Sequence, residues 1–279
     1  MPVYGLGTWM MGGNKKYNPD NDDEADTRAI RTAIDSGVIH IDTAEIYAEG
    51  HAEKIVARAI KGYDRSKLFI VSKVLSVNCS YDGILRACEQ SLLRLETDYL
   101  DLYLMHSVSR EFPLKESIRA LDRLVDEGIV RHIGVANFGK EILAEAQGYA
   151  SHQIVCDQVH YNLAFREPET SGLLEYCQTH DIFLMAWRPY RDILQTIPPI
   201  VSALCEKYNK TPAQLALNWL ISQDSVITLS KTRETAHLLE NLGSFGWEME
   251  ENDIEMLRRD FPGQLQKSDS VPLNGAVTR

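Results

Sequence analysis

The amino-acid sequence predicts a (β/α)8 barrel, a closed parallel sheet of eight strands with helices on the outside. Eight short apolar segments alternate with amphipathic segments along most of the 279 residues. Apolar strands that are each followed by a helix imply a parallel sheet covered by helices, and eight such units close into a barrel. The alternative, a doubly wound open sheet, usually carries Gly-x-Gly-x-x-Gly after a strand, and this chain contains no such motif.

The predicted strands are short and apolar, and segments with helical periodicity lie between them. They cover residues 3–8, 38–42, 67–73, 100–106, 133–136, 154–158, 182–187 and 226–229. In the segment that begins at Ile84, apolar residues return at Leu85, Cys88, Leu92 and Leu95, and charged residues fill other positions. This spacing predicts a helix that buries one face against the sheet.

Turn residues mark where the helices begin and end. Gly37, Gly62 and Gly128 follow helical segments and predict C-terminal stops. Thr211 and Pro212 predict an N-cap and a first-turn proline for the helix that follows. From about residue 263 the chain is polar and aperiodic, which predicts a tail or flap on a single barrel domain of residues 1–279.

The composition excludes some partners. Asp plus Glu number 40 and Lys plus Arg 29, so a net charge of −11 repels the phosphate backbone of nucleic acid. Five cysteines without a Cys-x-x-Cys motif predict free thiols in a reducing compartment. No stretch resembles a signal peptide or a membrane span, so we expect a cytoplasmic protein, and a monomer, without nucleic-acid or membrane partners.

Polar residues fall at the carboxyl ends of the predicted strands. Asp42, Lys73 and His106 end three consecutive strands. The later strands end in or are followed by Asn137, Gln158, Trp187 and Lys231. In a barrel all these ends surround one mouth. Each residue alone has an ordinary structural explanation, such as a helix cap or a surface lysine, but three ionisable groups at the ends of three buried strands indicate a shared site.

These groups suit proton transfer through a phenol. A Lys73 ammonium beside Asp42 stays charged despite burial. If Tyr47 lies against this ammonium, the charge favours phenolate, and we expect the pKa of Tyr47 to fall below its ordinary value near ~10. Such a phenol donates a proton to a carbonyl oxygen that His106 orients. The set contains no electron source, so reduction requires a hydride from a cofactor.

On these residues the sequence resembles the aldo-keto reductase family over nearly its whole length. The matching segments are Gly5-Leu6-Gly7-Thr8-Trp9, Asp42-Thr43-Ala44-Glu45-Ile46-Tyr47, Val71-Ser72-Lys73 and Leu104-Met105-His106. The resemblance implies an oxidoreductase that reduces aldehydes or ketones to alcohols with a nicotinamide cofactor. It implies that Tyr47 is the general acid and that Lys73 lowers its pKa. Asp42 would then hold Lys73, and His106 would position the carbonyl.

The same resemblance implies the residues that bind the cofactor. The segment from Gly134 to Phe138 is similar to the family's Gly-Val-Ser-Asn-Phe, with Ala136 in place of the serine. The aromatic position that stacks on the nicotinamide is Trp187. The implied cofactor-binding residues are Gly7, Thr8, Asp42, Asn137, Gln158, Trp187, Arg188, Lys231, Thr232, His237, Glu240 and Asn241. The implied substrate pocket consists of Trp9, Tyr47 and His106.

Two departures from the family pattern affect specificity. His237 stands where the family often has an arginine, so a 2′-phosphate would lose a permanently charged partner. Lys231 still favours NADP(H), with NAD(H) as the second candidate, and no metal is expected. Ser107 stands where many members carry a tryptophan, which predicts a less aromatic wall of the substrate pocket.

Three other activities compete with carbonyl reduction. A Schiff-base lyase would use Lys73 as nucleophile, but Asp42 beside it holds the lysine charged. A metal-dependent hydrolase would use Asp42, His106 and His160, but the chain has no His-x-His and a lysine repels a cation. A cofactor-binding regulatory subunit with little turnover is the third. The carbonyl substrate follows from no motif; small aldehydes, 2-oxoaldehydes and keto sugars are all candidates.

Overall fold

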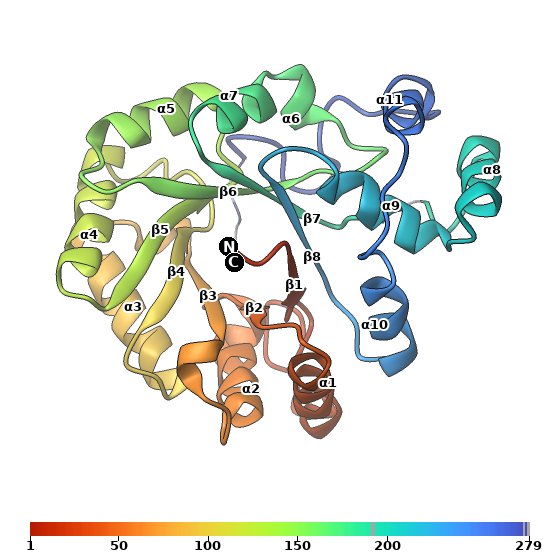
Figure 1. The fold of residues 1–279 in the computed structure, drawn as a ribbon. Coiled ribbons are helices and arrows are strands. Elements are labelled where there is room, and N and C mark those ends of the chain that lie inside the picture. The colour runs from red at the N-terminus through yellow and green to blue at the C-terminus, as the bar shows by residue number, and fades with distance from the viewer. Residues whose placement is uncertain (191–192, 276, 278–279) are drawn as a thin grey trace.

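A computed structural model describes residues 1–190, 193–275 and 277 and contains a closed barrel of eight parallel strands (Figure 1). The strands follow one another around the barrel in chain order, and the last closes against the first. They are Tyr4–Gly7 (β1), His40–Asp42 (β2), Phe69–Val74 (β3), Leu100–Met105 (β4), Val130–Ala136 (β5), Ile154–His160 (β6), Phe183–Trp187 (β7) and Val226–Ser230 (β8). Each predicted strand overlaps one of these, so the predicted (β/α)8 barrel is confirmed.

Helices surround the barrel (Figure 1). They are Asp23–Asp35 (α1), His51–Ile60 (α2), Tyr81–Leu95 (α3), Leu114–Asp126 (α4), Lys140–Tyr149 (α5), Glu167–Thr170 (α6), Leu173–Thr179 (α7), Pro199–Tyr208 (α8), Pro212–Ile221 (α9), Thr235–Leu242 (α10) and Glu251–Asp260 (α11). The N-cap of α9 is confirmed, because Thr211 and Gln214 form a capping box. The helix stops at Gly37, Gly62 and Gly128 are confirmed by left-handed φ angles of 93°, 94° and 71°.

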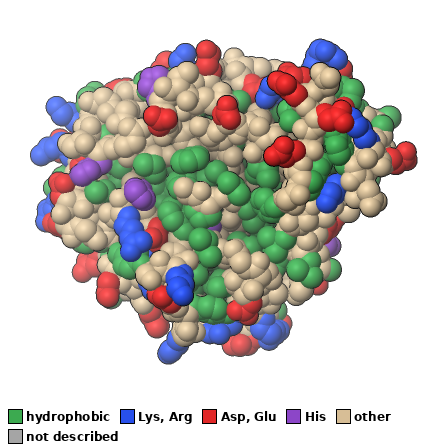
Figure 2. Space-filling model, viewed as in Figure 1, with side chains coloured by type: hydrophobic (Ala, Val, Ile, Leu, Met, Phe, Trp, Pro, Cys, Tyr) green, Lys and Arg blue, Asp and Glu red, His purple; other side chains and the backbone are tan. Residues whose placement is uncertain are grey.

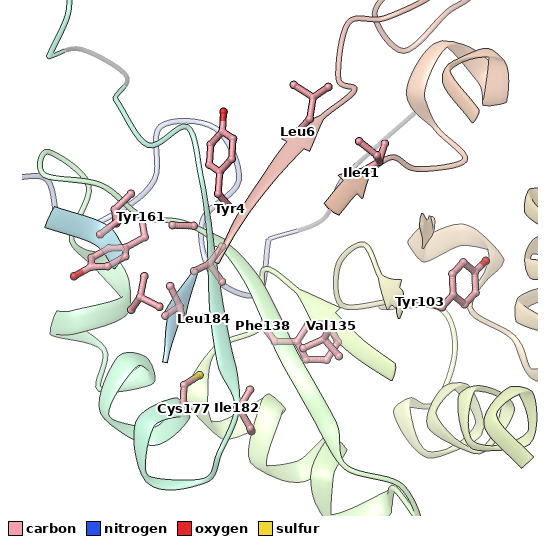
Figure 3. Packing of buried hydrophobic residues seen from close by; sticks show 14 of the residues in the cluster. Tyr4, Leu6, Ile41, Tyr103, Val135, Phe138, Tyr161, Cys177, Ile182 and Leu184 are labelled. Carbon is pink, nitrogen blue, oxygen red and sulfur yellow. The ribbon is translucent and has the colours of Figure 1, made fainter. Parts of the chain in front are cut away.

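Side chains on the strands alternate between the helices outside and the interior of the barrel. Tyr4, Leu6 and Ile41 belong to the large outer core (Figure 3). A smaller inner cluster consists of Val71, Leu102, Leu104, Cys156, Met185, Ile227 and Leu229. Because side chains alternate with a period of two, Lys73 on β3 faces inward with Val71, and Gln158 on β6 faces inward with Cys156.

Apolar side chains and the ring of His40 lie at the N-terminal end of the barrel. Met1 packs against the inner cluster, as do Phe69 and Phe183, the first residues of β3 and β7. A Cβ atom at Gly5 would lie 2.7 Å from Nδ1 of His40, so only glycine leaves room for this ring. In the view of Figure 1, apolar side chains gather over the middle of the molecule and charged ones lie mostly at its rim (Figure 2).

The polar segment after α11 lies against the loops at the carboxyl ends of β4 and β5. The amide of Asn274 donates to the carbonyl of Asn137 at 2.7 Å, and the amide of Val277 donates to Oγ of Ser107 at 3.0 Å. Ser107, which by the resemblance stands where many members carry a tryptophan, therefore lies next to the C-terminal segment. Among the described residues, no helix combines the length and the apolar character that crossing a membrane requires.

Candidate active site

Asp42 and Lys73 form a buried ion pair at the carboxyl ends of β2 and β3. The Nζ atom of Lys73 lies 2.6 Å from Oδ1 of Asp42 and 2.8 Å from the carbonyl oxygen of Thr43. The Lys73 side chain is fully buried. Oδ2 of Asp42 accepts from Nε2 of Gln158 at 2.8 Å. The carboxylate is thus held from two sides, which offsets the cost of removing two charges from water.

Tyr47 completes this group through its hydroxyl. The hydroxyl lies 3.4 Å from Nζ of Lys73, and the tyrosine is buried except for a small surface on the cavity. A short turn of residues Tyr47–Gly50 carries it, and Ala48 and Glu49 take left-handed φ angles of 48° and 56° within this turn. Sparsely populated backbone conformations of this kind concentrate at functional sites. The turn thus directs the phenol back into the mouth of the barrel.

The pKa of Tyr47 corrects the sequence-based expectation. Burial raises it above its ordinary value, and the nearby Lys73 ammonium opposes only part of that rise. Burial alone would lower the pKa of Lys73, but Asp42 and Tyr47 outweigh it and raise the pKa. The expected net lowering for Tyr47 is therefore wrong for the protein without ligands, because the sequence does not reveal how completely the phenol is desolvated. Tyr47 is a neutral phenol beside a charged ammonium, and Lys73 is poorly suited to act as a nucleophile.

His106 follows β4 as a neutral imidazole. Burial, with a further contribution from the Lys73 ammonium, holds its pKa well below the ordinary value. Its Nδ1 is buried and has no hydrogen-bond partner in the described part of the chain. The centres of its ring and the Tyr47 ring are 5.8 Å apart. Two uncharged groups, a phenol and an imidazole, therefore face the same space.

Asn137 and Gln158 offer amide groups on the other side of the mouth. Nδ2 of Asn137 donates to the carbonyl of His106 at 3.0 Å, while Oδ1 is buried without a partner among the described residues. Nε2 of Gln158 is bound to Asp42, which leaves its amide oxygen as the group to offer a ligand. Unused amide oxygens fit the carboxamide of a nicotinamide. These residues can therefore hold the implied cofactor.

Trp187 forms a flat wall beside these amides. Its ring stacks on His160 at 4.3 Å and 12°, and His160 stacks in turn on Phe165 at 4.1 Å. The guanidinium of Arg188 lies 5.3 Å from the Trp187 ring. A stack of three rings restricts the rotation of Trp187, whose indole lines the cavity.

A cavity of about 600 Å³ joins these groups at the mouth of the barrel, within the size range of small-molecule sites. Its lining residues are Gly7, Trp9, Lys15, Asp42, Ile46, Tyr47, His106, Asn137, Gln158, Trp187, Arg188, Pro189, Tyr190, Leu229, Ser230, Lys231, Ser270, Val271 and Val277. The structure thus brings together Trp9, the residues at the strand ends and Lys231, with the buried Lys73 behind them. Nine lining residues were not predicted from the sequence: Lys15, Ile46, Pro189, Tyr190, Leu229, Ser230, Ser270, Val271 and Val277. Leu229 and Ser230 could have been predicted from their position at the end of β8, and Ile46 from its place in the segment Asp42–Tyr47.

Five of the implied cofactor-binding residues lie outside the lining of this cavity. Oγ1 of Thr8 donates to the carbonyl of Asp42, and Oγ1 of Thr232 accepts from the amide of Glu234. His237 is exposed on α10. The other two are Glu240, which is half-buried, and Asn241, which donates to Oγ of Ser230 at 3.0 Å. Asn241 reaches the cavity through two lining residues, Ser230 and Tyr190, so its contact with a cofactor stays a prediction.

The metal-dependent alternative finds no support in the geometry. Within residues 1–190, 193–275 and 277, no group of three or more His, Cys, Asp or Glu side chains could hold a metal ion. A second hollow of about 460 Å³ is lined by residues of α6, α7 and α11 and by residues 222–224 before β8, with many acidic side chains. Acidic side chains alone do not define a site. The ionisable side chains of Asp42, Tyr47, Lys73 and His106 all lie at the barrel mouth.

Comparison with known proteins gives the family. The profile described as "Aldo/keto reductase family" matches residues 4–259. The chain belongs to the aldo/keto reductase family. It is 34% identical over 276 residues to the methylglyoxal reductase YeaE of Escherichia coli (strain K12), covering 96% of this chain and 94% of that protein.

Solved structures of family members have the same fold. One is a thermostable aldo-keto reductase, Tm1743, in complex with the inhibitor epalrestat, with a TM-score of 0.89, 38% identity and coverage of 92% of this chain and 94% of that one. Another is an aldo-keto reductase from Klebsiella pneumoniae in complex with NADPH, with a TM-score of 0.84, 34% identity and coverage of 96% and 93%. The barrel described above is therefore an aldo/keto reductase barrel.

Proposed function

We propose that this aldo/keto reductase reduces an aldehyde or ketone to the alcohol with NADPH, and that Tyr47 is the proton donor. The observation that carries the proposal is the Lys73 ammonium, buried between Asp42 at 2.6 Å and the Tyr47 hydroxyl at 3.4 Å. NADPH, when bound, supplies the hydride to the carbonyl carbon. The carbonyl oxygen gains negative charge and takes the proton of Tyr47.

Each residue of the group has a distinct task in this proposal. The raised pKa keeps Tyr47 protonated until the carbonyl oxygen becomes basic. As the proton leaves, the phenolate gains the full attraction of Lys73, which is stronger in the transition state than in the ground state. His106 is neutral and donates a hydrogen bond to the same oxygen. Asp42 keeps Lys73 charged and in place.

The residues proposed to bind the cofactor lie across the barrel mouth from Tyr47. Asn137 and Gln158 would hold the carboxamide and Trp187 would stack on the nicotinamide ring. Lys231 lies exposed at the edge of the cavity, and partial desolvation, with a contribution from Arg233, lowers its pKa. A phosphate there would gain a partly desolvated cation, which favours NADP(H) over NAD(H). Gly7, Thr8, Arg188, Thr232, His237, Glu240 and Asn241 stay predictions from the resemblance.

The test is a steady-state assay with NADPH or NADH and a panel of carbonyl compounds that includes methylglyoxal and 4-nitrobenzaldehyde. We expect turnover with NADPH. Lys231→Ala should raise KM for NADPH about tenfold or more and change KM for NADH little, because only NADPH carries the 2′-phosphate. Cofactor binding without turnover across the panel would instead favour the regulatory-subunit alternative.

We also propose that residues 1–279 act as one domain, as a monomer, in the cytoplasm. All five cysteines are free thiols and four are buried, as expected in a reducing compartment. The closed order of the strands requires both β1 and β8, so neither half of the chain can form the barrel alone. Light scattering coupled to size-exclusion chromatography measures the oligomeric state directly.

A further inference from the structure

The charge of the cavity is opposite to that of the chain. The sequence carries a net charge of −11. Its cavity at the barrel mouth is lined by three cationic side chains, Lys15, Arg188 and Lys231, and by one carboxylate, Asp42, which is neutralised by Lys73. A cationic cavity in an acidic protein attracts anions locally. The proposed cofactor accounts for part of this charge, because its phosphates are anionic.

The three cations lie on different sides of the mouth. Arg188 follows β7 and Lys231 follows β8, the side on which the proposed cofactor residues lie. Arg188 also lies 3.8 Å from Asp269. Lys15 belongs to the loop after β1, and backbone hydrogen bonds tie this loop to the turn that carries Tyr47. The backbone of Lys15 is therefore attached to the turn that carries the proposed proton donor, and its side chain lines the same cavity as Tyr47.

This loop is firmly attached. The carbonyl of Asn14 accepts from the amide of Ala48 at 2.7 Å, and that of Lys15 accepts from the amide of Glu49 at 3.0 Å. The left-handed conformations of Ala48 and Glu49 aim these two amides at the loop. Tyr17 adds a ring contact with His51 at 4.2 Å. Such an anchored loop can present one side chain to the substrate reproducibly.

Lys15 has no anionic partner of its own. Within the described residues, no carboxylate lies within ion-pair distance of its Nζ. The nearest carboxylate along the anchored turn, that of Glu49, is exposed, accepts from the amide of Tyr17 at 3.3 Å, and does not line the cavity. An ammonium at the edge of a cavity without a protein counter-ion leaves that charge for a ligand.

We propose that Lys15 selects carbonyl substrates that carry a carboxylate several bonds away from the reacting carbonyl. This inference rests on the proposed function and names its substrate class. The carbonyl oxygen would lie at Tyr47 and His106, and the distant carboxylate at Lys15. One ammonium on this side matches a single negative charge, so an oxo acid fits better than a doubly charged phosphate. Trp9 and Ile46, which also line this side, would contact the apolar part between the two groups.

The experiment compares two substrates that differ mainly in charge, 4-carboxybenzaldehyde and its methyl ester. For the wild-type protein with saturating NADPH, we expect kcat/KM to be higher for the acid, and this advantage to shrink at high salt. Lys15→Met should lower kcat/KM for the acid about tenfold and leave the ester within about twofold. Lys15→Glu should lower kcat/KM for the acid further. Lys15→Arg should keep most of the wild-type kcat/KM for the acid.

Lys16→Met is the matched control, because Lys16 is the adjacent exposed lysine and does not line the cavity. Lys16→Met should leave kcat/KM unchanged for both the acid and the ester. The inference is overturned if Lys15→Met affects acid and ester equally, or if it raises KM for NADPH instead, since Lys15 would then bind the cofactor. It is also overturned if Lys16→Met has the same effect as Lys15→Met. If neither aldehyde nor any other carbonyl is reduced, the proposed function itself fails.

Discussion

The barrel contains a buried carboxylate near each end, Asp101 and Asp42, and the two have different partners. Near the N-terminal end, Asp101 of β4 forms an ion pair with Nη1 of Arg65 at 2.8 Å. It accepts hydrogen bonds from Nη1 of Arg131 at 2.9 Å and from the amide of Ile70 at 2.9 Å. The two guanidinium groups lie 4.0 and 4.2 Å from the Tyr99 ring. At the mouth, Asp42 has one lysine and one amide.

The cations that neutralise the two carboxylates differ in their exposure to solvent. The arginines around Asp101 reach solvent, with 20% and 49% of their side chains exposed, so their charge needs no further partner. Lys73 is fully buried and next to a phenol, and the cavity beside it contains a buried amide oxygen of Asn137 without a partner among the described residues. The Asp101 cluster stabilises the fold, whereas the Asp42–Lys73 pair keeps a charge available for chemistry at a cost in desolvation.

Lys73→Met should have the largest effect. It leaves Asp42 buried without its cation, which costs about 3–5 kcal/mol of folding free energy. Reduction should fall by about 10²–10⁴-fold because the phenolate loses its counter-ion. Urea unfolding and steady-state kinetics measure the two effects. The double variant Lys73→Met/Asp42→Leu should recover stability but not activity; recovery of activity would contradict the role of the ammonium.

His40 should make the N-terminal end sensitive to acid. Burial lowers its pKa to about 4, so the folded protein binds a proton there less readily than the unfolded chain, whose histidine titrates near ~6.5. Stability from this residue is therefore complete above pH ~6.5 and is lost as the pH falls toward ~4, by roughly 3 kcal/mol. Unfolding measured from pH 7 to pH 4 should show a smaller loss for His40→Leu than for the wild type; identical profiles would contradict the burial argument.

Asp101→Ala should separate stability from activity. The change removes the anionic partner of Arg65 and Arg131 and the acceptor for the amide of Ile70. Because both arginines reach solvent, we expect a moderate loss of folding free energy of about 2 kcal/mol. The value of kcat should stay within about twofold, because the cluster lies away from the cavity. Denaturant unfolding and the carbonyl assay test this together. A large loss of kcat at unchanged stability would remove the distinction between the two ends.

The sequence predicted the barrel and the convergence at its mouth because both follow from strand order. Asp42, Lys73 and Gln158 end up in contact since inward positions at the carboxyl ends of parallel strands must meet. Three features did not follow from the sequence. Lys15 lies in a loop without periodicity, and only the hydrogen bonds to Ala48 and Glu49 place it at the cavity.

The other two features depend on tertiary packing. The sign of the pKa change of Tyr47 depends on how fully the phenol is buried, which a motif does not encode. The position of Val277 beside Ser107 depends on the path of a polar segment that has no regular structure of its own.

The most direct measurement of the central claim is the rate of hydride transfer in single turnover by Tyr47→Phe, with cofactor affinity measured by quenching of tryptophan fluorescence. Phenylalanine keeps the ring and removes the proton. The account predicts that the affinity for NADPH stays within about twofold and that the rate falls by about 10²-fold or more. A Tyr47→Phe protein that transfers hydride at the wild-type rate would contradict it.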